Sequence, residues 1–244
     1  VLSAIYGYAI FYIPFIYINL FVTFGFGALV GLLVGFAAKL GKVRNSILVV
    51  LFGLGFGLLS EFLGWAVWIY AAQDVLILNP MTILRFLQIV ATEGAWSIFG
   101  WTPTGFALWA IWGLEAITII GASTAVAWSI VGTTPFCEHC DRWIDDEDSI
   151  APLTPIVDQE DIKERLEQGE LACLYDLEMR DGAPTSYTEL SLLHCPGCQE
   201  NHFLTVKTVT VTVDSDNDES KDEEEIVENL RITADQHAEL MEQW

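Results

Sequence analysis

The first half of the chain consists of long apolar stretches separated by short polar breaks. Residues 1–38 are almost uninterrupted apolar and aromatic side chains, a run too long for a single bilayer crossing of about 20 residues. A break near Pro14 and Asn19 divides this run into two helices. The pattern predicts about four membrane spans, over residues 1–13, 16–38, 46–70 and 102–131.

Capping residues refine the ends of these helices. Ser46 is an N-cap candidate for the third span, and Thr102 followed by Pro103 is typical of the start of the fourth. Residues 79–92 begin with Asn-Pro and predict a short amphipathic helix on the membrane surface rather than a crossing.

The basic residues of this half predict its orientation in the membrane. Three of its four lie in the loop formed by residues 39–45, which the positive-inside rule places in the cytoplasm. Four spans then put both chain ends on the cytoplasmic side. The expected location is therefore a membrane, with the second half of the chain in the cytoplasm.

The second half changes to a period of two and contains two C-x-x-C motifs. Val and Thr alternate up to Val213, which predicts a β-strand. Cys195-Pro-Gly-Cys198 precedes this strand, and Cys137-Glu-His-Cys140 lies shortly after the last span. Four thiolates complete a closed tetrahedral Zn²⁺ site. We expect a small α+β, zinc-ribbon-like domain with structural zinc.

The 54 residues between Cys140 and Cys195 exceed the spacing of a compact zinc site. A helical insert is predicted, capped by Asp158 and running to Gln168, followed by an apolar stretch in which Cys173 is a buried residue rather than a ligand. Rubredoxin-like iron and thiol redox chemistry are the alternatives to zinc. Three histidines lie near the motifs and are expected to be bystanders, with replacement of a cysteine ligand or a hydrogen bond to the thiolates as the alternatives: His139, His194 and His202.

The last segment is strongly acidic before it becomes helical. Residues 214–225 resemble a calcium loop in the spacing of their acids, but lack its central Gly, so a flexible acidic linker is expected. Thr233 and Gln236 form a capping box for a helix over 234–243. The expected organisation is a transmembrane domain, a zinc-ribbon-like domain, and a linker with a terminal helix, over residues 1–132, 133–213 and 214–244.

Charge separates the two halves further. Residues 1–136 carry four acidic and four basic side chains, whereas residues 137–244 carry 29 acidic and seven basic ones. Such a domain is repelled by nucleic-acid phosphates. A protein partner with a basic surface is expected, with solubility as the alternative explanation of the charge.

Two acidic residues lie inside predicted spans. Glu61 and Glu115 fall at nearly the same depth, and no Lys or Arg lies in either span to neutralise them. A charged side chain at the bilayer centre costs about 2.5–3.5 kcal/mol on insertion scales. The two residues form either an intramembrane proton or ion site, or two neutral carboxyls hydrogen-bonded to their neighbours.

Glycines recur every four residues on two of the spans: Gly27, Gly31, Gly35, Gly53 and Gly57. Small residues at this spacing allow helix backbones to approach closely. Packing within one subunit is the expected use, and a homo-oligomer interface is the alternative.

The chain resembles a group of uncharacterised bacterial multi-pass membrane proteins with a C-terminal zinc-ribbon-like domain. The resemblance covers most of the chain and is carried by the two cysteine motifs and by residues 12–17, 41–45 and 228–234. It implies this architecture, located in a bacterial inner membrane, and no substrate.

The expected function is that of a membrane-anchored adaptor whose acidic, zinc-stabilised cytoplasmic domain binds another protein. The alternative is a small transporter, channel or ion-coupled membrane subunit that uses Glu61 and Glu115. An enzyme ranks third, because the sequence contains neither a nucleophile–base constellation nor a phosphate loop.

Overall fold

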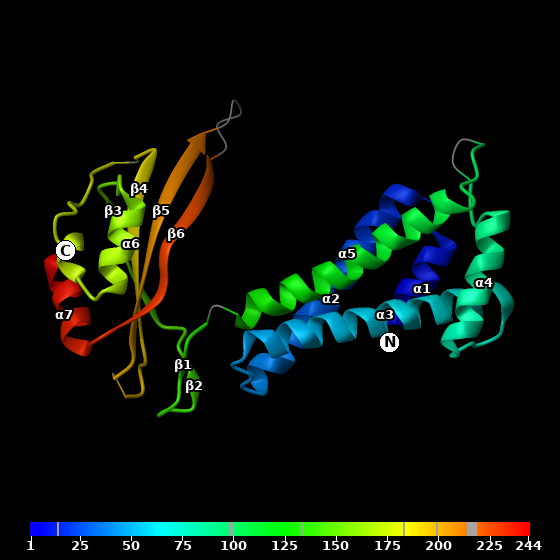
Figure 1. The fold of residues 1–244 in the computed structure, drawn as a ribbon, viewed down its shortest axis with the longest axis horizontal. Helices are drawn as coiled ribbons and strands as arrows, with labels where there is room; N and C mark the ends of the chain where they lie inside the picture. Colours follow the sequence, from blue (N-terminus) through cyan, green and yellow to red (C-terminus); the bar gives the residue numbers. More distant parts are fainter. Residues whose placement is uncertain (14, 98–99, 133, 183, 199, 214–218) are drawn as a thin grey trace. The chain divides into compact units, whose positions relative to one another are not determined.

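The protein folds into two units, each with its own hydrophobic core (Figure 1). The computed structural model describes residues 1–13, 15–97, 100–132, 134–182, 184–198, 200–213 and 219–244. The units are Val1–Thr133 and Thr134–Trp244. The boundary expected at residue 132 lies one residue from this division.

The first unit is helical throughout. Its elements are α1 (Leu2–Tyr12), α2 (Ile16–Leu40), α3 (Ser46–Gln73), α4 (Pro80–Glu93) and α5 (Phe106–Val131). Three of them, α2, α3 and α5, are long and apolar enough to cross a membrane. Helix α1 has 11 residues and extends for about 16 Å, shorter than a bilayer core of about 30 Å. Three of the four predicted spans therefore correspond to helices long and apolar enough to cross a membrane, and Pro14 lies outside the described residues.

The helix ends correct two predicted caps. Asn45 rather than Ser46 caps α3, because the Asn45 side chain accepts from the backbone N–H groups of Ile47 and Leu48. Helix α5 is capped by Gly105 and begins four residues after Thr102. The Gly105 N–H donates to the Ala91 carbonyl at the end of α4, so the connection between α4 and α5 continues past Thr102. The predicted helix over 79–92 is confirmed as α4, with Asn79 as its cap.

Helix α5 packs against both α2 and α3 (Figure 1). The glycines of α2 meet α5 at steadily increasing positions, Gly27 near Ile119 and Gly35 near Ile130, so these two helices are parallel. On α3 the order reverses, with Gly53 near Thr124 and Gly57 near Ile120, so α3 is antiparallel to α5. All five predicted packing glycines therefore face α5 within one chain.

The second unit contains one hairpin of short strands and one four-stranded antiparallel sheet. The hairpin joins β1 (Phe136–Cys137) and β2 (Arg142–Trp143). The sheet has the order β3-β4-β5-β6, formed by β3 (Glu147–Leu153), β4 (Ser186–His194), β5 (His202–Val213) and β6 (Glu219–Ile232). A strand-rich region with a cysteine cluster thus follows the apolar helices, as expected.

One face of this sheet is covered by the helices α6 (Gln159–Glu167), η1 (Leu171–Leu174) and α7 (Ala234–Gln243) (Figure 1). Leu166 of α6 and Leu240 of α7 are fully buried together with Leu192 of the sheet. The predicted insert helix with Asp158 as its cap is confirmed, and so is the capping box of the terminal helix.

The expected acidic linker is partly wrong. Residues 214–218 lie outside the described residues, but Glu219 begins β6, which pairs with β5 along 14 residues. The acidic side chains of β6 up to Glu225 are exposed. Strand pairing outweighs the weak β-propensity of Asp and Glu because the following Ile226 and Val227 bury themselves in the core.

Candidate functional site

The second unit brings the four predicted metal ligands together. Cys137 ends β1 and Cys140 lies in the turn before β2, whereas Cys195 and Cys198 lie in the turn between β4 and β5. Their sulfur atoms all lie within 4.8 Å of one another. The Sγ atoms of Cys137 and Cys198 are 3.6 Å apart, close to the separation of about 3.8 Å that a tetrahedral ion with 2.3 Å metal–sulfur bonds requires.

The surroundings of the Cys137 sulfur atom favour its thiolate form, whereas burial and the neighbouring thiols raise the pKa of Cys140. The Cys140 N–H and the Asn201 side-chain amide both donate to Cys137 Sγ, at 3.4 and 3.2 Å. Burial opposes ionisation, but these donors and the neighbouring thiols outweigh it and lower the pKa of Cys137. Cys195 of the cluster is fully buried, and so is the neighbouring Ile144. The four cysteines can therefore hold one metal ion in a closed, largely dry site.

Gly197 is required by the tightness of this cluster. A Cβ atom at Gly197 would lie 2.7 Å from Cys140 Sγ. The Cys195–Cys198 turn therefore approaches the first motif more closely than any side chain at position 197 would allow. The glycine of C-P-G-C is therefore required for the close approach of the two cysteine turns, as well as for the conformation of its own turn.

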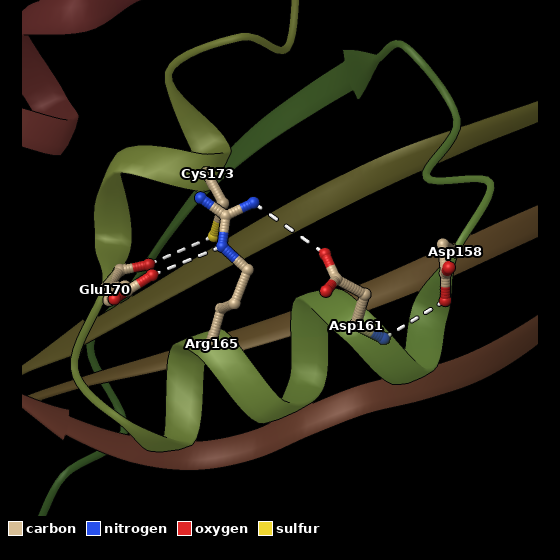
Figure 2. Close-up of polar contacts among 5 residues, drawn as sticks. All are labelled: Asp158, Asp161, Arg165, Glu170 and Cys173. Carbon is tan, nitrogen blue, oxygen red and sulfur yellow. Dashed lines mark hydrogen bonds and ion pairs between the residues drawn. The ribbon is translucent and has the colours of Figure 1, made fainter.

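Cys173 lies elsewhere, on η1 next to α6, as Figure 2 shows. Its thiol donates to the Glu170 carbonyl at 3.0 Å. Arg165 of α6 pairs with Glu170 and Asp161, at 3.3 and 3.8 Å. Cys173 is not among the residues grouped as a metal site, in agreement with its prediction as a buried residue.

The first unit contains a cavity of about 580 Å³ lined by α1, α2, α3 and α5. Glu61 and Glu115 both line it, although they are 54 positions apart in the sequence. The antiparallel approach of α3 and α5 explains this meeting. Gly53 lies against Thr124 and Gly57 against Ile120, so one further helical turn brings residue 61 to the level of residue 116.

Each carboxyl group has a hydrogen-bond donor in the cavity wall. The Trp65 indole N–H donates to Glu61 Oε1 at 2.8 Å. The Tyr6 hydroxyl donates to Glu115 Oε1, and its oxygen lies 3.2 Å from the Thr23 hydroxyl. Glu61 Oε2 is buried and has no hydrogen-bond partner among the described residues. The cavity therefore retains Glu61 Oε2 as an atom able to accept a proton or a cation, and Asn19, whose Oδ1 also has no partner among the described residues, lines the same cavity.

Sequence reasoning identified the two carboxyls and missed Tyr6 and Thr23. Both appeared as ordinary members of apolar helices, because the packing of α1 against α2 and α3 leaves no trace in the residue pattern. The only signal in the sequence was that each is a polar side chain within an otherwise apolar helix. A second omission is His237, whose ring lies near those of His194 and His202.

Comparison of the chain with family models, curated proteins and solved structures finds no match. Two features of the chain bear on its function: the cysteine cluster of the second unit and the cavity around Glu61 and Glu115 in the first.

Proposed function

We propose that the protein is an integral membrane protein that binds a proton or a small cation between Glu61 and Glu115, as part of a transport or conduction path. The observation that carries this proposal is the cavity that both carboxyls line, with the unpartnered Glu61 Oε2 beside it. Intramembrane acids are costly and mark ion or proton pathways in many membrane proteins. The geometry therefore supports a transport function better than an adaptor function.

The chemistry follows from two like charges around one cavity. Two ionised carboxylates in a medium of low dielectric repel each other, so a shared proton or a bound cation lowers the energy of the pair. The Tyr6 hydroxyl holds Glu115 in place, and Trp65 holds one oxygen of Glu61. Glu61 Oε2 then exchanges the proton or cation.

The proposed topology places residues 39–45 and the second unit in the cytoplasm of a bacterial cell. Lys39, Lys42 and Arg44 supply the positive-inside signal. Helix α5 is parallel to α2, which ends at this loop. Both helices then finish on the cytoplasmic side, with α1 as a short fourth membrane helix.

Ion flux through reconstituted proteoliposomes tests the proposal. Glu61→Gln and Glu115→Gln keep the shape of the side chain and remove the ionisable group, so each is expected to reduce proton or cation flux by about tenfold or more. Glu93→Gln is the control, since Glu93 is exposed at the end of α4. Unchanged flux in both cavity variants, with unchanged thermal stability in detergent, contradicts the proposal.

We further propose that the cysteine cluster binds Zn²⁺, and that the ion stabilises a zinc-ribbon-like fold of the second unit. Support comes from the four sulfur atoms within 4.8 Å of one another and from the two turns that carry them. A site with four protein ligands has no open position for substrate, so its role is structural.

The acidic edge of the sheet favours a second function, binding a basic protein partner. Strand β6 is an edge strand, and residues 219–225 expose five acids against one lysine. Affinity purification of a variant with Glu219→Gln, Asp222→Asn and Glu225→Gln tests it. The matched control replaces three exposed acids of α6: Glu160, Glu164 and Glu167. A partner retained equally by both variants rules out β6 as the docking site.

A further inference from the structure

The register of the sheet places several potential metal ligands at one end of its covered face. His194 of β4 and His202 of β5 are paired residues on neighbouring strands. Asp148 of β3 pairs with Leu192, two positions before His194 on the same face of β4. Asp148 and both histidines therefore share the face that α7 covers.

Helix α7 adds His237 to this group. Its first turn is fixed by the capping box, in which the Gln236 N–H donates to Thr233 Oγ1 and the Thr233 N–H to the Gln236 side chain. The next residue, His237, starts the regular helical hydrogen bonds by donating to the Thr233 carbonyl at 3.0 Å. Its ring centroid lies 5.5 Å from that of His194 and 4.5 Å from that of His202.

Three of these side chains have the geometry of a metal site. One ligand atom from each of Asp148, His194 and His237 lies within 4.8 Å of the other two. His194 Nδ1 is 3.6 Å from Asp148 Oδ2. Ligands of a tetrahedral Zn²⁺ at 2.0–2.1 Å are about 3.3 Å apart, so small side-chain rotations close the site.

Two buried ring nitrogens are the second, independent observation. His194 Nδ1 and His237 Nε2 are shielded from solvent and have no hydrogen-bond partner among the described residues. A buried polar atom without a partner costs about 1–3 kcal/mol. An ion that binds both nitrogens supplies the missing partner, which the nearby apolar core of the sheet does not.

We propose that Asp148, His194 and His237 form a second metal site, which takes one divalent ion of the Zn²⁺ type and lies apart from the four-cysteine cluster. Two imidazoles and one carboxylate suit Zn²⁺, and three protein ligands leave a position for water, unlike a closed thiolate site. Asp148 is about half exposed, so the open position faces the surface. The ion would fasten α7 to β3 and β4.

Zinc content of the full chain in detergent tests this assignment, with Zn²⁺ alone as the probe. The wild-type protein is expected to retain two equivalents after mild dialysis, and His237→Gln one. Cys198→Ser removes the other equivalent and leaves the histidine site. His139→Gln is the control, because His139 is exposed and lies outside the proposed ligand set; it is expected to retain both.

X-ray absorption at the zinc edge distinguishes the two sites without relying on stoichiometry. The wild type should show sulfur ligands at about 2.3 Å and nitrogen or oxygen ligands at about 2.0 Å, and His237→Gln sulfur alone. Asp148→Asn tests the same site without disturbing the core and should weaken binding of the second equivalent by about tenfold or more. A single, all-sulfur equivalent in the wild type, or two equivalents in both His237→Gln and Asp148→Asn, overturns the proposal.

Discussion

At the scale of single residues, the five cysteines differ because their neighbours differ. Four lie within reach of one ion, where Cys137 receives hydrogen bonds from Cys140 and Asn201. Cys173 instead lies in the apolar core between η1 and the sheet, with 6% of its surface exposed. Its thiol is a donor to the Glu170 carbonyl rather than a ligand. The C-x-x-C spacing in the sequence was enough to distinguish the four candidate ligands from Cys173.

Cys173 is expected to resist alkylation in the folded protein. Burial raises the pKa of its thiol, so less thiolate is present at pH 8 than in an exposed cysteine, and access is restricted as well. Mass spectrometry after a short iodoacetamide pulse should show labelling at least about tenfold slower than in the denatured chain. Addition of a chelator should expose the other four cysteines first. Rapid labelling of Cys173 before chelation contradicts this burial.

Caps show where residue-level prediction stops. Asp158 and Thr233 were identified correctly, because each stands beside a clear helix signal. Ser46 and Thr102 were wrong, since a neighbouring Asn45 is an equally good cap and the α4–α5 connection is held by Gly105. The preference of single residues for cap positions does not predict a hydrogen bond to a helix end 14 positions away, such as the one from Gly105 to Ala91.

At the scale of elements, helix packing depends on which glycine faces a partner. A Cβ atom at Gly57 would collide with the Ser123 hydroxyl and come within 3.1 Å of Ile120 Cα, whereas one at Gly55 would meet nothing within 4 Å. Ser123 also donates to the Gly53 carbonyl across the same interface, at 3.0 Å. The four-residue spacing of Gly53 and Gly57 therefore marks the positions at which α3 contacts α5.

Gly57→Leu is expected to destabilise the helical unit, and Gly55→Leu to leave it nearly unchanged. Forcing a side chain into the α3–α5 contact costs about 1–3 kcal/mol, while the Gly55 position is open. Thermal unfolding in detergent, followed by helical circular dichroism, measures both. Equal losses in the two variants would mean that the glycines act through helix propensity instead of packing.

Strand β6 shows why one element escaped prediction. Its first seven residues are nearly all acidic, a composition typical of solvated linkers. In the sheet they lie opposite the Val/Thr run of β5, and Lys207 pairs with both Glu223 and Glu189, at 3.2 and 3.3 Å. The partner strand, which is remote in the sequence, determines this conformation. The β4–β5 hairpin was more predictable, because Val and Thr alternate along β5 and Cys195-Pro-Gly-Cys198 precedes it.

At the scale of the whole molecule, the division into two units follows from composition. The apolar helices can bury their polar backbone groups in a bilayer, whereas the acidic second half requires water. The second unit, with 111 residues, has its own core, to which the cysteine cluster adds a small satellite core around Ile144. The cavity in the first unit was not predictable beyond its two carboxyls, since its walls come from four helices.

Removal of the metal should therefore disorder the cysteine turns of one unit and spare the other. Without an ion, the two turns lose the metal–sulfur bonds that hold them together, so they should separate and the β1–β2 hairpin should lose its order. Hydrogen exchange of the full chain after chelation, or in Cys198→Ser, is expected to rise over residues 136–144 and around Cys195, while the rest of the four-stranded sheet, which has its own core, and α2, α3 and α5 keep their protection. Cys173→Ser is the matched control, because a hydroxyl can still donate to the Glu170 carbonyl. Unchanged exchange around both cysteine motifs after the ion is lost would show that the fold does not depend on it, and increased exchange in the helices would show that the two units unfold together.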